Sequence, residues 1–312
     1  MTGYILRRLL WLAPVIFFAA LITFVLMHLV PGGPWDTHDR PISPQLEAQL
    51  EAKYGLGEPV WRQFLTYSWN ALHGDLGISL QNQDRPVTEI IGQGLEVSAV
   101  LGLMALAFAI AVGVSLGVTA AVRQNTWLDY GSVFLATVAA SVPSFVLGTL
   151  LIIVFSVQLG WLPVFGWERA WWVFPDWRHA VLPVVTLGAL PAAYIARITR
   201  ASVLDALQQD YVRTARAKGL GERIVLVRHV LKNAMIPILT VAGPIAAALV
   251  TGSFIVETVF AIPGLGRQFV TSVFARDYGV IMGTTIFYAV VIAVANLVVD
   301  VMYAAVNPRI RY

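Results

Sequence analysis

Six long stretches of this sequence contain no Lys, Arg, Asp or Glu, and they constrain its fold more than any other feature. They have 18 to 30 residues each: 9–30, 98–122, 131–160, 179–196, 234–256 and 280–299. A helix needs about 20 apolar residues to cross the hydrocarbon core of a membrane. The sequence therefore predicts an all-α integral membrane protein with six transmembrane helices, the third of them kinked at Pro143.

The composition agrees with this interpretation. The chain is 58% hydrophobic and 12% charged, with a mean hydropathy of +0.73, whereas roughly 25% of the residues of a soluble domain are charged. The isoelectric point is near 9.3. Because the basic residues cluster at the ends of the apolar stretches, they indicate membrane topology, and nucleic acid is not an expected partner.

The shortest stretch, 179–196, has 18 residues and contains Pro183, Gly188 and Pro191. Charge supports it as a span, because the loop after it, 197–233, holds eight of the 21 Lys and Arg residues against three acids, and basic loops stay cytoplasmic. In the six-span arrangement 13 of the 21 lie inside. We therefore expect both termini and this loop in the cytoplasm.

The chain divides into three expected regions. Residues 1–30 form the N-tail and first span, which is too long for the ~7–15-residue core of a signal peptide. Residues 31–97, with nine acids and four bases, form a folded external segment. It is expected to contain one helix over 43–55 and another over 59–72. Residues 98–312 form the five-span core that includes the cytoplasmic loop.

The loop 197–233 has the pattern of a short helix followed by a second one. Asp210 is expected to cap the first helix, whose basic residues fall toward its end. Gly219 is expected to end it in the left-handed conformation. The second helix is expected to begin near Glu222 and to continue into the next span.

Small side chains on the first of these helices indicate a contact with a partner. Tyr211 and Ala215 lie four residues apart and so share a face. Ala215 and Ala217 are small enough to leave room for a partner's backbone or side chain. The alternative is a basic amphipathic loop that lies on anionic lipid.

The order of residues in this helix is typical of a known motif. Residues 213–219 read Arg-Thr-Ala-Arg-Ala-Lys-Gly, which resembles the cytoplasmic coupling-loop motif of binding-protein-dependent ABC importer permeases, in the form found in the dipeptide and oligopeptide branch. The motif of the wider superfamily begins Glu-Ala-Ala and has Gly four residues after the last Ala. This chain keeps Ala215 and Gly219 but has Arg213 and Thr214 in the first two places.

Other stretches resemble the same branch and follow in the same order. They are 73–79, 228–234, 257–266, 276–278 and 300–311, the last with Asn307 where the branch more often has Asp. The resemblance thus extends from the first span to the last residue.

The resemblance implies a permease subunit of an ABC importer that moves dipeptides or oligopeptides across the cytoplasmic, or inner, membrane of a prokaryote. The implied partners are a second related permease, two cytoplasmic ATPase subunits that bind ATP and Mg²⁺, an external substrate-binding protein and membrane lipid. Relatives of the branch carry nickel or oligosaccharides, and the sequence leaves that alternative open. It also leaves open which residues line the substrate path and whether the second permease is identical.

Within this resemblance, the residues expected to couple the permease to an ATPase are Asp210, Tyr211, Arg213, Thr214, Ala215, Arg216, Ala217, Lys218, Gly219 and Glu222. In the external segment the aromatic residues Trp61, Phe64, Tyr67 and Trp69 exceed what a connector needs. Our hypothesis is that part of this external segment contacts the binding protein, and the alternative is packing onto the permease itself.

The sequence shows no catalytic site. It has no P-loop pattern, no Cys, and no His pair with the spacing of metal ligands on a helix. We therefore expect neither enzymatic activity nor a bound metal or cofactor. A distant alternative, an ion-coupled carrier, would need ionisable residues inside spans, and only Asp300, at a span end, comes near. We expect Asp300 to be structural and paired with Arg309 or Arg311.

Overall fold

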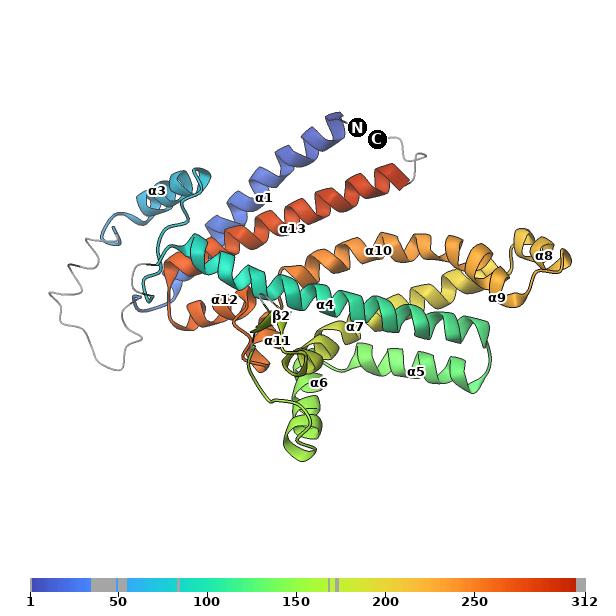
Figure 1. Cartoon of the computed structure of the whole chain (residues 1–312). Coiled ribbons are helices and arrows are strands. Elements are labelled where there is room, and N and C mark those ends of the chain that lie inside the picture. Colours follow the sequence, from blue (N-terminus) through green and yellow to red (C-terminus); the bar gives the residue numbers. More distant parts are fainter. Residues whose placement is uncertain are drawn as a thin grey trace.

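The computed structural model describes residues 2–34, 49, 55–82, 85–167, 169–171 and 174–306, and over these residues the chain is almost entirely helical (Figure 1). Its helices are α1 (Thr2–Leu29), α3 (Val60–Leu72), α4 (Val87–Val122), α5 (Trp127–Ser141), α6 (Ser144–Leu151), the π-helix η1 (Ile152–Gln158), α7 (Trp177–Leu207), α8 (Asp210–Ala217), α9 (Glu222–Ile224), the π-helix η2 (Val225–Leu231), α10 (Lys232–Val250), α11 (Phe254–Val259), α12 (Leu265–Phe274) and α13 (Tyr278–Val306). A short antiparallel hairpin, β1 (Arg169–Trp171) and β2 (Phe174–Pro175), precedes α7.

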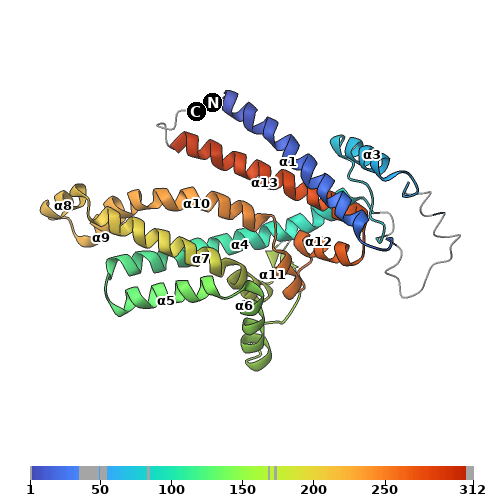
Figure 2. The same cartoon turned by 180° about the vertical axis from the view of Figure 1, so that it is seen from behind.

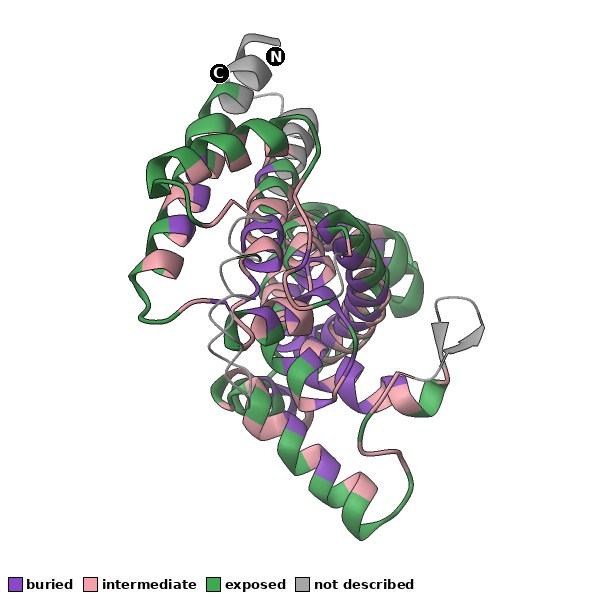
Figure 3. Cartoon of the chain, turned by 90° about the vertical axis from the view of Figure 1, so that its left-hand side faces the viewer, coloured by how far each residue is buried: buried purple, intermediate pink, exposed green. Residues whose placement is uncertain are grey.

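Helices α4 and α7 lie side by side and form the centre of a bundle, with α5 and α10 packed against them (Figure 2). The close approach of α4 and α7 depends on glycine residues of α4. A Cβ atom at Gly113 would lie 2.7 Å from the carbonyl oxygen of Ala192, and one at Gly117 would lie 2.5 Å from that of Ala196. Small residues at such crossings are what helix association in lipid requires. Figure 3 shows that buried residues gather in this central region.

Four described helices are long and apolar enough to cross a membrane: Leu10–Leu29, Val87–Val122, Trp177–Leu207 and Glu222–Val259. They correspond to the predicted first, second, fourth and fifth spans. Helix α13 pairs with α1 and is apolar over Tyr278–Val294, which overlaps the predicted sixth span, 280–299. The predicted all-α membrane protein is confirmed, and the exact number of spans stays a prediction.

The third predicted span is not a single kinked helix. Helix α5 and the continuous α6 and η1 meet at an angle of 107° (Figure 1). Val142 is extended, with φ −86° and ψ 123°, because the ring of Pro143 disfavours helical backbone in the residue before it. Pro143 also lacks the N–H that a continuing helix needs. Residues 131–160 therefore form two helices that run in different directions.

The external segment is described in part. Helix α3 confirms the helix expected over 59–72, whereas the one expected over 43–55 lies outside the described residues, apart from residue 49 and Gly55. Tyr67 packs inward beside the cluster around Phe64, and burial raises the pKa of its hydroxyl well above the usual range. Helix α4 begins at Val87, so it crosses the expected region boundary at residue 97.

Candidate coupling site

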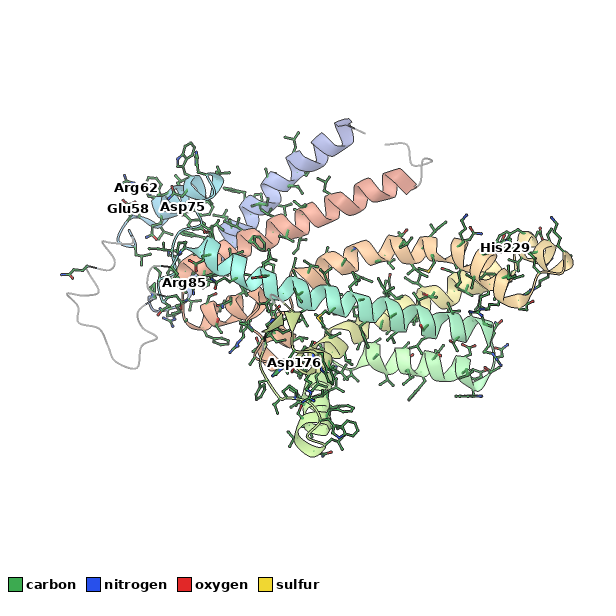
Figure 4. The ribbon with its side chains drawn as sticks, in the orientation of Figure 1. Glu58, Arg62, Asp75, Arg85, Asp176 and His229 are labelled. Atoms are coloured by element: carbon green, nitrogen blue, oxygen red, sulfur yellow. The ribbon has the colours of Figure 1, made fainter. Side chains whose placement is uncertain are left out.

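Helix α8 lies beyond the ends of α7 and α10, at the far end of the bundle from α3 (Figure 1). Figure 4 places His229 at the α8 end, and Glu58, Arg62 and Asp75 at the other. The expected cap is shifted by one residue. Gln209 occupies the cap position, but its side chain does not cap the helix and donates instead to the Asp205 carbonyl at 3.3 Å, and Asp210 is the first helical residue. There its carboxylate still interacts favourably with the helix dipole.

The end of α8 follows the prediction. Gly219 has φ +78°, its N–H donates to the Arg216 carbonyl at 2.9 Å, and the Leu220 N–H donates to the Ala215 carbonyl at 3.3 Å. These two bonds form a Schellman motif, which satisfies carbonyls that the helix leaves free. The left-handed backbone is strained for any residue with a Cβ atom, so Gly219 fixes the direction in which the chain leaves α8.

The inner face of α8 packs against other helices of the same chain. Val212 is fully buried and Ala215 is 4% exposed. Both belong to a cluster completed by Ala121, Val203, Ala206, Val225, Val230 and Ala234. The expectation that Ala215 leaves room for a partner is therefore wrong: α7, η2 and α10 of the same chain fill that place. Tyr211, which was expected to share the face of Ala215, is 38% exposed.

The outer face of α8 is free of contacts within the described chain over much of its surface. Tyr211, Arg213, Thr214, Ala217 and Lys218 are exposed. The Arg213 guanidinium lies 3.5 Å from the Asp210 carboxylate, and both side chains are highly exposed. This face therefore carries positive charge and one aromatic ring at the end of the bundle.

One ion pair connects α8 to the next helix. The Arg216 guanidinium donates two hydrogen bonds to the Glu222 carboxylate, at 2.8 and 3.1 Å. Sequence analysis placed both residues in the site but did not pair them. The pair spans the Gly219 turn and links α8 to α9, from which η2 and α10 continue as one helical stretch. The second helix expected near Glu222 is confirmed.

A second ion pair connects the helices behind α8, and sequence analysis missed it. Arg200 of α7 donates to Asp129 of α5 from Nε at 2.7 Å and from Nη2 at 2.9 Å. The Asp129 side chain is 3% exposed and also accepts from the Asn125 N–H at 3.0 Å. Arg200 lies seven residues, about 10 Å, before the end of α7. The sequence offered only one sign of this pair, a charged residue near the end of each of two spans. Membrane topology is a sufficient explanation for such charges, so they did not predict a contact.

A second buried carboxylate lies where α4, α11 and α12 meet. Glu257 has no exposed surface, and it accepts from Ser98 Oγ at 2.7 Å and from the Arg267 N–H at 3.0 Å. Ser98 in turn accepts from the Leu265 N–H at 2.8 Å. A Cβ atom at Gly264 would collide with the Glu257 side chain. The stretch 257–266 thus folds around its own glutamate, which gives it a structural role.

Two other stretches that resemble the peptide branch meet in space. Ser79 donates through Oγ to the Asp277 carboxylate, and the Leu80 N–H donates to its other oxygen at 3.0 Å. Asp300 lies on α13, but its side chain, Arg309 and Arg311 are outside the described part, so the expected pairing stays a prediction. Among the described residues no group of three or more His, Cys, Asp or Glu side chains could hold a metal ion.

Comparison with protein families decides the class. Residues 113–312 match the family described as binding-protein-dependent transport system inner membrane component. The chain belongs to this family. The matched part of this transport component contains α7, α8 and α10, and therefore the whole candidate coupling site.

Named relatives are similar along their full length. The transport component is 41% identical over 311 residues to the dipeptide transport system permease protein DppB of Bacillus subtilis (strain 168), covering 100% of this chain and 98% of that protein. It is 43% identical over 317 residues to the glutathione transport system permease protein GsiC of Escherichia coli O6:H1, and 40% identical over 312 residues to the oligopeptide transport system permease protein OppB of Escherichia coli (strain K12). Both comparisons cover 100% of each chain.

Two solved structures share its fold. One is a crystal structure of an amino acid ABC transporter, with a TM-score of 0.54 and 19% identity, covering 70% of this chain and 94% of that one. The other is the MetNI methionine ABC transporter in an inward facing conformation, with a TM-score of 0.57 and 18% identity, covering 70% of this chain and 97% of that one.

Proposed function

We propose that this chain is the permease subunit of an ABC importer that moves dipeptides or oligopeptides across the cytoplasmic membrane. The observation that carries the proposal is full-length identity of 40% to 43% to permeases named for dipeptide, glutathione and oligopeptide transport. These names favour peptides over the nickel and oligosaccharide alternatives. ATP would be hydrolysed on separate ATPase subunits, and a binding protein would deliver the substrate to a path between two permeases.

The outer face of α8 is proposed to contact an ATPase subunit. It is exposed, basic, and attached to α7 and α10 by the buried cluster around Val212 and Ala215. A force applied to α8 would therefore reach the central helices through packed contacts instead of through a loose loop. In this proposal Tyr211, Arg213, Thr214, Ala217 and Lys218 provide the contact. Gly219 and the pair of Arg216 with Glu222 set its angle.

The orientation proposed is that α8 and both chain termini lie in the cytoplasm. The start of α1 and the end of α13 lie side by side in both views of the bundle (Figures 1 and 2), which supports two termini on the same side. The count of Lys and Arg assigns that side to the cytoplasm. A thiol reagent that cannot cross membranes, applied to intact cells, should label a cysteine at position 70 and not one at position 214. Labelling of 214 alone would reverse the orientation.

Reconstitution tests the function. Vesicles are prepared with this permease, the second permease and the ATPase subunits, the ATPases facing the lumen. They should accumulate a labelled dipeptide only when ATP is inside and the binding protein is outside. Labelled Ni²⁺ and an oligosaccharide serve as competing substrates in the same vesicles. Accumulation that continues without ATP but follows an imposed proton or sodium gradient would refute the importer and favour an ion-coupled carrier.

A further inference from the structure

Helix α3 has three different faces around its axis. The first packs inward through Phe64, which is 7% exposed and whose ring centroid lies 5.2 Å from that of Phe24 and 5.7 Å from that of Phe17, both on α1. The second is polar and consists of Arg62, Gln63, Thr66 and Asn70. The third is apolar and exposed: Trp61, Leu65, Trp69 and Leu72, with exposed fractions of 66%, 57%, 66% and 81%. We call this third set the α3 stripe.

The α3 stripe has the geometry of one continuous surface. Its members lie at i, i+4, i+8 and i+11, which places them within about 80° of one another on a helix with 100° per residue. The polar residues occupy the adjoining third of the circumference, at about 100–200° on the same scale. Trp69 is at the border between the stripe and the polar face. A tryptophan at such a border is typical of the interface between lipid and water, since its ring is apolar and its N–H is polar.

The depth of α3 follows from what it packs against. Phe17 and Phe24 belong to the apolar span Leu10–Leu29. With a rise of 1.5 Å per residue, Phe24 lies about 7 Å and Phe17 about 18 Å before the end of that span. A helix whose buried ring touches both must lie beside the terminal half of the span. The α3 stripe, which faces away from the bundle, is therefore at the level of the bilayer and not above it.

The helix against which α3 packs also presents exposed apolar side chains. Phe18, Ile22 and Leu26 of α1 are 56%, 56% and 58% exposed, on a helix that crosses the membrane. The Phe17 ring lies 5.6 Å from that of Phe18 and 5.7 Å from that of Phe64. These aromatic contacts join the exposed apolar surface of α1 directly to α3.

We propose that α3 is an interfacial membrane anchor whose stripe of Trp61, Leu65, Trp69 and Leu72 is buried in the boundary between lipid headgroups and acyl chains, with the polar face toward water. The leaflet is the one in which α1 ends, and the proposal does not depend on which side of the membrane that is. It requires only that α1 spans the bilayer. Apolar area buried at this depth is what holds such helices at an interface.

This geometry limits which part of the external segment can contact the binding protein. Phe64 and Tyr67 pack inward and cannot take part. Trp61 and Trp69 are on the α3 stripe, where a soluble protein would have to displace lipid to reach them. The polar face of α3 is the part of this helix left for a protein partner on the aqueous side.

Quenching of a fluorescent label tests the proposal in the assembled transporter. Cysteines are placed singly at Leu65 and Leu72 in this Cys-free chain, labelled with bimane, and reconstituted into phosphatidylcholine nanodiscs with normal or brominated acyl chains. Thr66→Cys and Asn70→Cys are matched controls on the polar face, and Phe18→Cys is the lipid-facing reference. The two stripe positions are more than half exposed, so the label disturbs no packing within the described chain.

Labels at 65, 72 and 18 should lose at least half of their fluorescence in brominated lipid and resist aqueous iodide. Labels at 66 and 70 should show the reverse, and adding binding protein should change neither stripe label. Iodide quenching at 65 and 72 without an effect of brominated lipid overturns the proposal. So does protection that appears only with binding protein, which would make the stripe its docking site. Labels that neither quencher reaches also overturn it, because another protein subunit must then cover the stripe.

Discussion

Arg200 and Asp129 join α7 to α5 through two hydrogen bonds of 2.7 and 2.9 Å, about two turns before α7 leads into the candidate coupling site. The Asp129 side chain is almost fully shielded from solvent, with 3% of its surface exposed. The pair therefore links α7 to α5 near the candidate coupling site, and under the proposed function a displacement of α8 would reach both helices.

Removing one partner of this pair should destabilise the permease more than removing both. Asp129→Asn leaves the Arg200 charge without its partner and should lower stability by about 3 kcal/mol, the lower end of the range for broken buried pairs, since Arg200 is 31% exposed. The double variant Asp129→Asn/Arg200→Gln, which leaves no unpaired charge, should lose less stability than Asp129→Asn alone. Thermal unfolding of the purified protein in detergent measures this cycle.

The matched control for that cycle is the exposed pair of Asp210 and Arg213, 3.5 Å apart. An exposed ion pair contributes about 0–1 kcal/mol, so the corresponding variants should unfold almost as the wild type does. Equal effects of the two cycles would show that the pair of α5 and α7 is not a structural connection.

Gly219→Val should uncouple transport from ATP hydrolysis. The substitution costs about 1–2 kcal/mol in a left-handed backbone, although nothing lies within 4 Å of the added Cβ, so strain and not collision is the cause. Relief of that strain would change the angle at which α8 leaves the turn. The measurement is ATP hydrolysis with and without loaded binding protein in the assembled complex.

Gly221→Val is the matched control, two residues away. Its position also has open space around a Cβ atom, but its φ is −63°, which any residue adopts. Stimulation of ATP hydrolysis should persist in this variant and disappear in Gly219→Val. If both variants retain full stimulation, the geometry of the turn does not matter for coupling.

Tryptophan at positions 215 and 217 should act in different ways. Ala215 is buried in the chain's own cluster, so Ala215→Trp overpacks it and should release α8, seen as faster proteolysis within 197–233. Ala217 is exposed, so Ala217→Trp should leave proteolysis unchanged and yet reduce stimulated ATP hydrolysis by obstructing the partner. Unchanged hydrolysis in Ala217→Trp would remove residue 217 from the contact.

Breaking the ion pair of Arg216 and Glu222 should have a small effect on coupling, and this effect should depend on salt. Both side chains are exposed, at 42% and 73%, so the pair contributes about 0–1 kcal/mol and is screened by added ions. Arg216→Glu should weaken coupling mildly at low salt. The exchange Arg216→Glu/Glu222→Arg should restore the hydrogen bonds across the turn. If the exchanged variant is as weak as the single one, Arg216 acts on the partner and not on Glu222.

Much of the fold could be predicted because its determinants are local. Runs without charge specify spans through the cost of placing charge in lipid, and Gly219 after a basic last turn specifies the end of α8. Pro143 predicted a deviation, but the size of the bend depends on how α6 packs after it. The same sequence signal is compatible with a slight kink and with the observed 107°.

The parts that could not be predicted depend on contacts between distant residues. Asp129 and Arg200 are 71 residues apart and Ser79 and Asp277 are 198 apart, so no spacing rule pairs them. Ala215 shows a different limit. A small residue on an amphipathic helix suits a partner's surface and the chain's own core equally well, and only the arrangement of α7, η2 and α10 decides between them.

Crosslinking from the outer face of α8 tests the central claim most directly. Thr214→Cys, labelled with benzophenone maleimide in the assembled and ATP-hydrolysing transporter, should give a crosslinked product that contains an ATPase subunit. Asn70→Cys at the opposite end of the bundle should give none. Products of position 214 with lipid alone, in a complex that still couples ATP hydrolysis to uptake, would contradict the assignment of α8 as the coupling helix.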